Sequence, residues 1–364
     1  MEGLELTVFG DIYRGISVLV TGHTGFKGAW LALWLKKLGA DVTGVSLDAN
    51  SKYSHWDLLG LDISDQRFDI RNFEKIKESI NIAKPKIVFH LAAQSLVRHS
   101  YSDPLNTWTT NIMGTVNVLE ACRQEPSVRA VVTVTSDKCY ENKEWSWGYR
   151  ETDRLGGHDP YSASKACSEL VVASYRNAFC GPPNTPLLAS VRAGNVIGGG
   201  DWSDDRLIPD MVRAIRDEKT LEIRSPKSTR PWQHVLEPLS GYLLLGQRLL
   251  QRRQNFAQAW NFGPNRDGNR AVENVLSIMK KEWPALNWQI TQSPQPYEAN
   301  LLYLDSSQAN QHLDWTPVWS FNESIFATAA WYRAFLEQDK IMSSVQLDEY
   351  VKRAQSNGLK WSID

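Results

Sequence analysis

Short runs of β-branched and apolar residues alternate with longer segments of helical periodicity through the first half of the chain. Runs of this length suit strands that are buried on both faces. The predicted strands are residues 16–21, 42–46, 87–91, 130–135 and 187–192. Between them, residues 26–38 predict a helix that ends at Gly39, and Pro104 and Pro160 stand where further helices can begin. The alternation is typical of parallel strands joined by crossover helices.

The regular pattern weakens after Arg192, where a glycine loop and repeated prolines interrupt the chain. It returns briefly, because residues 236–250 have helical periodicity and 259–262 suit a strand. A chain of 364 residues also exceeds the length at which one hydrophobic core usually keeps growing.

The pattern therefore predicts an α/β fold with two lobes. The first is a Rossmann-type, doubly wound parallel sheet, made from residues 1–193 and about 234–264. The second is a smaller α/β lobe, made from residues 194–233 and 265–364.

Glycines at three-residue intervals separate the first predicted strand from the first predicted helix. Gly22 permits a tight turn, Gly25 lets the backbone approach a pyrophosphate, and Gly28 allows the helix to pack closely. The N-terminus of the helix then offers free N–H groups to the anion. This turn, from Thr21 to Gly28, predicts a bound nicotinamide dinucleotide.

The end of the second predicted strand usually carries an acid that binds the ribose hydroxyls of NAD. Here the candidates are Ser46 and Asp48, which point to the same side if the strand continues past Ser46. Asp48 could equally be an ordinary loop carboxylate. No arginine adjoins either position in the sequence, and this favours NAD over NADP.

Tyr161 and Lys165 are four residues apart just after Pro160, so on a helix they share one face. A lysine ammonium beside a phenol favours the phenolate, which makes tyrosine a usable base. Ser136 follows the strand predicted at 130–135 and can hydrogen-bond a substrate oxygen. On its own, a Tyr and Lys pair at this spacing could also lie on a solvated helix.

The order of these motifs resembles the extended short-chain dehydrogenase/reductase family of NAD-dependent epimerases and dehydratases. The resemblance covers nearly the whole chain, and it implies a Rossmann lobe that binds NAD and a smaller lobe that binds a nucleotide sugar. The residues that it implies for the cofactor are Gly22, Thr24, Gly25, Phe26, Lys27, Gly28, Ser46, Asp69, Ile70, Leu91, Ala92, Ala93, Asn111, Tyr161 and Lys165. The catalytic residues that it implies include Ser136, Tyr161 and Lys165.

Asp137 and Lys138 follow Ser136 at the same strand end, and a simple dehydrogenase has no use for them. They resemble the elimination catalysts of the 4,6-dehydratase branch, in which an Asp protonates the departing 6-hydroxyl and the next residue, usually Glu, removes the C5 proton. Lys138 stands where that Glu usually stands. Together with the stretch 22–28 and the run 147–165, this difference makes the chain resemble the dehydratases that act on CDP-glucose. To act as the base that removes the C5 proton, Lys138 needs a lowered pKa. The alternative is that a protonated Lys138 stabilises the enolate while another group removes the C5 proton.

Four residues are expected on the substrate side of the site: Gln94, Asn195, Arg206 and Arg230. The two arginines lie in the proline-rich stretch and can pair with a diphosphate in bidentate fashion. Either could instead be an ordinary surface arginine. His90, inside an apolar strand, is expected to be a hydrogen-bonded core histidine, and no metal site is expected.

Composition narrows the class of protein without changing this picture. The hydrophobic fraction of 42% and the charged fraction of 22% suit a folded globular chain. A net charge of −1 with no basic stripe argues against a nucleic-acid partner. The four scattered cysteines indicate a reducing compartment, and the absence of a long apolar run argues against a membrane span, so a cytoplasmic location is expected.

Two other functions stay open at this point. An epimerase or reductase of nucleotide sugars needs the Ser136, Tyr161 and Lys165 set without Asp137 and Lys138. A dinucleotide sensor that has no catalytic activity would typically lack the tyrosine and lysine pair. The resemblance also implies a homodimer or a dimer of dimers, through a face for which the helices at 105–124 and 161–179 are the candidates. The apolar faces of these helices could equally belong to the core.

Overall fold

The computed structural model describes residues 8–49, 51, 53–182, 184–291 and 301–363. Its centre is a parallel sheet of seven strands in the order β3-β2-β1-β4-β5-β6-β11. The strands are β1 (Ser17–Thr21), β2 (Asp41–Ser46), β3 (Ser64–Arg67), β4 (Ile87–His90), β5 (Ala130–Val134), β6 (Leu187–Arg192) and β11 (Ala259–Asn261). The strand order reverses between β1 and β4, which is the point where open α/β sheets bind their ligands.

The predicted fold class is confirmed, and each of the strands predicted for the sheet is present within a residue or two. The prediction missed β3, which has the sequence Ser-Asp-Gln-Arg at one edge of the sheet and is mostly exposed. An edge strand with so little burial carries no apolar run, so the hydrophobic pattern gives no sign of it.

Helices connect the strands as the pattern predicts. Pro104 and Pro160 each begin a helix, and the side chains of Asp103 and Asp159 cap their N-termini. The helices are α1 (Phe26–Lys37), α2 (His55–Leu59), α3 (Phe73–Ala83), α4 (Val97–Ser102), α5 (Pro104–Trp108), α6 (Gly114–Gln124), α7 (Pro160–Phe179), α8 (Leu207–Arg216), α9 (Leu236–Leu250), α10 (Val272–Glu282), α11 (Ser307–Leu313), α12 (Phe321–Gln338) and α13 (Ser343–Ser356). A π-helical turn, η2 (Thr109–Met113), joins α5 to α6, and a short 3-10 turn, η3 (Asp137–Cys139), follows β5.

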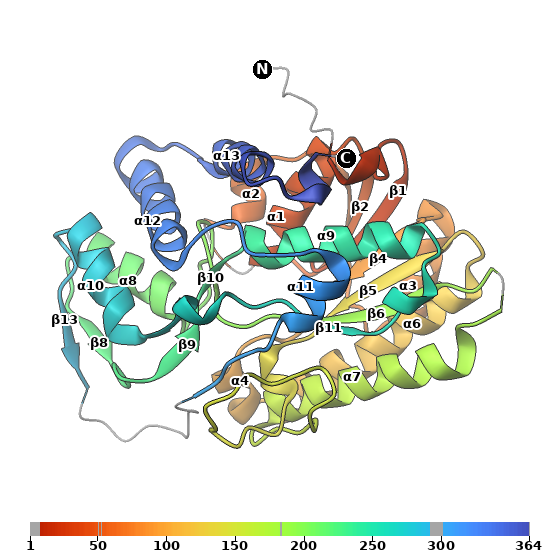
Figure 1. The fold of residues 1–364 in the computed structure, drawn as a ribbon, viewed down its shortest axis with the longest axis horizontal. Helices are drawn as coiled ribbons and strands as arrows, with labels where there is room; N and C mark the ends of the chain where they lie inside the picture. Colours follow the sequence, from red (N-terminus) through yellow and green to blue (C-terminus); the bar gives the residue numbers. More distant parts are fainter. Residues whose placement is uncertain (1–7, 50, 52, 183, 292–300, 364) are drawn as a thin grey trace.

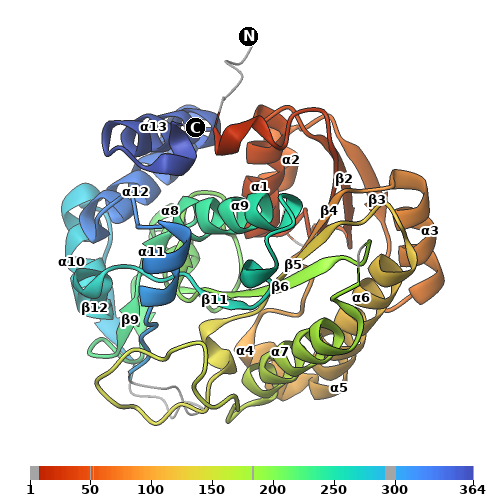
Figure 2. The same ribbon diagram turned by 45° about the vertical axis from the view of Figure 1, so that its right-hand side comes forward.

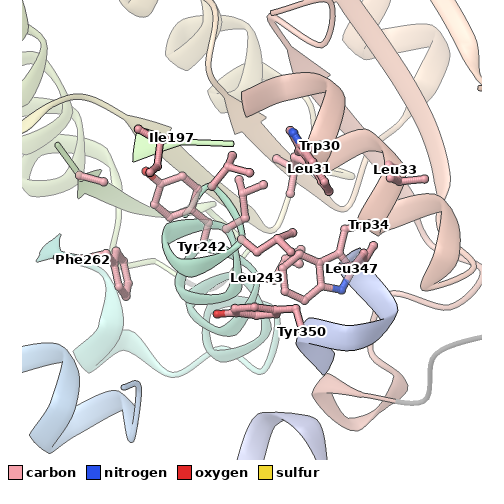
Figure 3. Packing of buried hydrophobic residues seen from close by; sticks show 14 of the residues in the cluster. Trp30, Leu31, Leu33, Trp34, Ile197, Tyr242, Leu243, Phe262, Leu347 and Tyr350 are labelled. Atoms are coloured by element: carbon pink, nitrogen blue, oxygen red, sulfur yellow. The ribbon is translucent and has the colours of Figure 1, made fainter. Parts of the chain in front are cut away.

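Helices cover both faces of the sheet, as a doubly wound fold requires (Figure 2). On one face, α3, α6 and α7 pack against the strands through a cluster that includes Ile76, Val118 and Val172. On the other face, α1 and α9 contribute to a larger core that also takes in α13, where Trp34, Leu243 and Tyr350 lie together (Figure 3).

The remaining strands form three pairs of short strands. They are β7 (Val196–Ile197) with β10 (Gln233–His234), β8 (Leu221–Ile223) with β13 (Trp288–Ile290), and β9 (Thr229–Pro231) with β12 (Asn269–Ala271). The last two pairs lie with α8, α10 and α12 to one side of the large sheet, at the left of Figure 1. The C-terminal α13 instead returns to α1, where Lys37 pairs with Asp348 at 2.5 Å. The exact division into two lobes stays a prediction.

Two absences apply to the described part of the chain. None of its helices combines the length and the apolar character that crossing a bilayer requires. It also contains no group of three or more His, Cys, Asp or Glu side chains arranged to hold a metal ion.

Candidate active site

The glycine turn lies between β1 and α1, at the carboxyl edge of the sheet. Gly22 has a φ of 77°, and a Cβ added to it would lie 2.7 Å from the backbone nitrogen of Ala92. A Cβ on Gly28 would collide with the carbonyl of Gly22, so neither position has room for a side chain. Gly25, the N-cap of α1, makes no side-chain cap, so the N–H groups of the first turn stay available to an anion. These features fit the pyrophosphate of NAD.

Side chains tie this turn to the neighbouring strands. Thr24 Oγ1 lies 2.7 Å from Ser46 Oγ at the end of β2, and it donates to the carbonyl of Leu47 at 3.0 Å. His23 Nε2 lies 2.9 Å from Asp65 Oδ1 on β3. Burial lowers the pKa of His23, and the Asp65 carboxylate opposes that shift. The sequence prediction did not include the His23–Asp65 pair, because its second member lies on the strand that was missed.

No arginine adjoins the end of β2 in the sequence, but the pairing of β2 with β3 brings one beside it. Arg67, the last residue of β3, is in register with Ser46. Its Nη1 donates to the carbonyl of Leu47 at 3.1 Å, and its Nη2 donates to Asp65 at 2.7 Å. Arg67 stands 21 positions after Ser46 in the chain, and the pairing of the two strands brings them together. Asp48, the alternative candidate for the ribose, is exposed.

The residues predicted for the adenine side follow β3. Asp69 accepts hydrogen bonds from the guanidinium of Arg71 at 2.6 and 2.9 Å. Burial alone would raise the pKa of Asp69, but these bonds outweigh burial and lower it. Ile70 is buried against Gly114 at the start of α6, where a Cβ would lie 2.5 Å from its Cδ1. Asp69 and Ile70 are therefore fixed at the carboxyl edge of the sheet, beside α6.

Asn111 and Gln94 shape the loop that follows β4, which begins with Leu91, Ala92 and Ala93. Asn111 accepts from the backbone N–H of Gln94 at 2.8 Å and donates to its carbonyl at 3.0 Å. It also donates to Ser164 Oγ on α7 at 2.8 Å. The side-chain amide of Gln94 bonds to Leu96 and Thr107. The structure thus places Gln94 as a residue that holds the loop, and its contact with the substrate stays a prediction.

His90 bears out its prediction as a core histidine. Its two ring nitrogens lie 2.7 Å from Thr21 Oγ1 and 3.1 Å from Thr115 Oγ1. Burial lowers its pKa to about 3, so the ring is neutral and its hydrogen bonds are satisfied.

The predicted elimination catalysts lie directly after β5. Ser136 caps η3, where its Oγ donates to Asp137 Oδ1 at 3.0 Å and accepts from the N–H of Lys138 at 3.2 Å. Asp137 is only 2% exposed and lies against the backbone of Gly194, and its Oδ2 has no hydrogen-bond partner among the described residues. A buried carboxyl oxygen without a partner is costly, which suits an atom that a substrate hydroxyl completes. Lys138 is half-buried at the same strand end.

Tyr161 and Lys165 lie on the buried face of α7, both nine-tenths or more buried. Burial raises the pKa of Tyr161 to about 12, and an interaction with Ser136 opposes the rise. Burial lowers the pKa of Lys165 to about 8, and the charge of Glu169 opposes the fall. Lys165 Nζ donates to the carbonyl of Val134 at 3.3 Å, at the end of β5. Ser136 and Tyr161 therefore lie close together, and the amine of Lys165 lies at the end of the strand that precedes Ser136. The catalytic roles of the three residues stay a prediction.

A buried ion pair behind Lys165 was not predicted. Glu169, one helical turn further along α7, pairs with Arg192 of β6 at 2.8 Å, and both side chains are at most 3% exposed. Glu169 also accepts from Thr135 Oγ1 and from Ser190 Oγ, the latter at 2.7 Å. The spacing of Tyr161, Lys165 and Glu169 at i, i+4 and i+8 is the only sequence signal that could have indicated the pair.

Charged side chains from α1 and from the loop before α8 complete the site. Burial lowers the pKa of Lys27 to about 8; Arg206 and Lys165 lower it further, while Asp137 and Asp201 oppose the fall. Lys27, predicted as a cofactor residue of the turn, therefore also lies within electrostatic reach of the Asp137 carboxylate. Arg206 donates to Asp201 Oδ2 at 3.0 Å, and its charge lowers the pKa of Tyr161.

The other two residues expected on the substrate side are Asn195 and Arg230. Asn195 has a φ of 43° in the loop after β6, and its carbonyl accepts from the N–H of Gln233 at 3.4 Å. Arg230 is buried in β9, where its Nη1 donates to the carbonyl of Thr229 at 2.8 Å. Their contact with a substrate stays a prediction, as it does for Arg206.

Comparisons with known proteins show the family and the fold of this chain. A family model described as GDP-mannose 4,6 dehydratase matches residues 19–328. A CDP-glucose 4,6-dehydratase of Salmonella typhimurium is 47% identical over 350 residues, which cover 94% of this chain and 98% of that one. The structure of an epimerase from Methanothermobacter thermautotrophicus superposes with a TM-score of 0.80 at 25% identity, over 90% of this chain and 95% of that one. A dTDP-glucose 4,6-dehydratase from Streptomyces venezuelae, solved with NAD bound, gives a TM-score of 0.74 at 23% identity, over 87% of this chain and 96% of that one.

Proposed function

Because the chain belongs to the GDP-mannose 4,6-dehydratase family, we propose that it is an NAD-dependent nucleotide-sugar 4,6-dehydratase whose substrate is CDP-D-glucose. The product is CDP-4-keto-6-deoxy-D-glucose, with release of one water. The choice of CDP-glucose over other nucleotide sugars is supported by the 47% identity to the Salmonella enzyme over nearly the full length of both chains.

The observation that carries the reaction type is the buried carboxyl of Asp137 beside Ser136 at the end of β5, with Lys138 next in the chain. An epimerase or a reductase needs the Ser136, Tyr161 and Lys165 set alone. A general acid at this position has a use only when a hydroxyl must leave as water.

Each of the catalytic residues is assigned one part of the reaction. Bound NAD supplies the chemistry of accepting a hydride from C4 and returning it to C6. Tyr161 takes the proton of the 4-hydroxyl while Ser136 holds that oxygen, and a 4-ketone forms. The ketone acidifies the C5 proton, which Lys138 removes, and Asp137 in its protonated form gives a proton to the 6-hydroxyl, which leaves as water. A proton then returns to C5, so the net change is the loss of one water.

The substrate and the reaction are tested together by incubating the protein and NAD with CDP-, UDP-, GDP- and dTDP-glucose. We expect only CDP-glucose to yield a product lighter by one water, measured by mass spectrometry, with no net formation of NADH because the hydride returns to the sugar. A product of unchanged mass would indicate epimerisation and would overturn the proposal. Loss of water from another nucleotide sugar alone would overturn the choice of base.

The role of Lys138 is tested by replacing it with Met. As the C5 base, its loss should abolish exchange of the C5 proton with deuterated solvent, while oxidation at C4 continues and NADH accumulates on the protein. Lys143→Met removes a nearby lysine that is exposed and paired with Glu141, so it is a matched control that should leave exchange unchanged. Exchange retained in Lys138→Met would instead favour the electrostatic role, with another group as the base.

We also propose the setting of the reaction. A 4-keto-6-deoxy product suits deoxysugar biosynthesis of the O-antigen type in lipopolysaccharide, carried out in the cytoplasm, where nucleotide sugars are made. A homodimer through the segment from α5 to α6 and through α7 is supported by exposed apolar side chains. Leu105 on α5, Met113 on η2 and Leu170 on α7 are 77%, 50% and 58% exposed.

A further inference from the structure

Three polar side chains meet where β2 ends, and we call them the β2-end cluster: Thr24 from the glycine turn, Ser46 from β2 and Arg67 from β3. Thr24 Oγ1 and Ser46 Oγ lie 2.7 Å apart, and Thr24 and Arg67 both donate to the same carbonyl, that of Leu47. The shared carbonyl places the guanidinium of Arg67 beside the two hydroxyls. In a doubly wound sheet this is the place where the adenosine ribose of a dinucleotide binds.

The cluster lacks the group that normally excludes NADP. An acid at the end of β2 binds the 2′-hydroxyl of NAD and repels a 2′-phosphate, and Ser46, at that position, is neutral. Asp48, two residues further on, is exposed, so solvent and salt screen its charge. The hydroxyls of Thr24 and Ser46 carry no charge, so unlike an acid they do not repel a 2′-phosphate.

Arg67 adds the charge that a phosphate needs. Its side chain is 30% exposed, and a guanidinium carries five N–H donors, of which Leu47 and Asp65 take two. Asp65 opposes an incoming anion, but it already bonds to His23 as well as to Arg67. Donors therefore remain on Arg67 at the solvent side of the cluster.

We propose that the cofactor site of this chain binds NADP as well as NAD, and that Arg67 is the residue that pairs with the 2′-phosphate. The inference rests on the dinucleotide site of the proposed function and extends it to a second dinucleotide. Because the proposal assigns the 2′-phosphate to a single side chain, replacing that side chain should change the ratio of the affinities for NADP and NAD rather than weaken both.

The test measures the dissociation constants of NAD and NADP by isothermal titration calorimetry, without any sugar and at low salt. For the unmodified chain, we expect the two constants to lie within about tenfold of each other. Arg67→Met should weaken NADP by about 10–100-fold, the usual range for a lost hydrogen bond to a charged group, and change NAD by less than about threefold. Ser46→Asp should weaken NADP by at least as much and leave NAD bound as well or better.

A matched control is Arg123→Met, which removes an arginine paired with Glu120 on α6 and should leave both constants unchanged. NADP that binds the unmodified chain more than 100-fold more weakly than NAD would overturn the proposal. So would an Arg67→Met variant in which the ratio of the two constants changes by less than about threefold. Because binding is measured without a sugar, a failure to dehydrate CDP-glucose would leave this result unaffected.

Discussion

Replacing Tyr161 with Phe is expected to lower kcat for the dehydration of CDP-glucose by about 10²–10⁴-fold, the usual contribution of a positioned acid or base. The hydroxyl is the group that takes the proton from the 4-hydroxyl, and the first step cannot proceed without it. The aromatic ring stays, so the packing of α7 and the dissociation constant of NAD should change little. A stopped-flow record of NADH formation should show that the first hydride transfer is the step that is lost.

The surroundings of Tyr161 also predict how the rate depends on pH. Burial raises the pKa of this phenol to about 12, while Ser136 and Arg206 act to lower it. The rate of C4 oxidation should therefore rise with pH through the neutral range, since only the deprotonated phenol accepts a proton. Tyr175→Phe is a matched control on the same helix, where the hydroxyl contacts Glu120, and it should retain full activity. A Tyr161→Phe variant that keeps more than a tenth of the activity would contradict the assignment.

The hydrophobic pattern predicts the fold well where strands are buried and fails where one is not. β1, β4 and β5 are apolar because helices cover both of their faces, so their sequences alone identify them. β3 lies at the edge of the sheet and is polar, so the pattern did not predict it. Without β3, nothing in the sequence places Arg67 near the cofactor. The inference that NAD is preferred over NADP depended on that omission.

The residues of the candidate site also fall into two groups, those that the sequence could predict and those that it could not. Groups close together in the chain, such as the glycine turn and the tyrosine and lysine pair, could be predicted because their spacing fixes their geometry within one element. The Glu169–Arg192 pair and the bonds of Gln94 could not, because each depends on which elements the fold places side by side. A pattern along one chain carries no information on such tertiary partners.

The Glu169–Arg192 pair is expected to carry the largest single effect on stability. Glu169→Gln keeps the size of the side chain but leaves the charge of Arg192 buried without its partner, and breaking a buried pair in this way costs about 3–5 kcal/mol. The free energy of unfolding, measured with urea, should fall by that amount. The control Glu337→Gln breaks the exposed pair with Arg333 and should cost about 0–1 kcal/mol.

The pH dependence of this loss identifies its cause. Burial alone would raise the pKa of Glu169, but Arg192 and hydrogen bonds from two hydroxyls outweigh it and lower the pKa. A carboxyl with a lowered pKa in the folded state stabilises the protein above its unfolded pKa, and this stability is lost as the pH falls through the folded pKa. The difference between the unmodified chain and Glu169→Gln should therefore be full at pH 7 and shrink in acid. A difference that stays constant down to pH 3 would mean that the variant loses packing or hydrogen bonds rather than the charge.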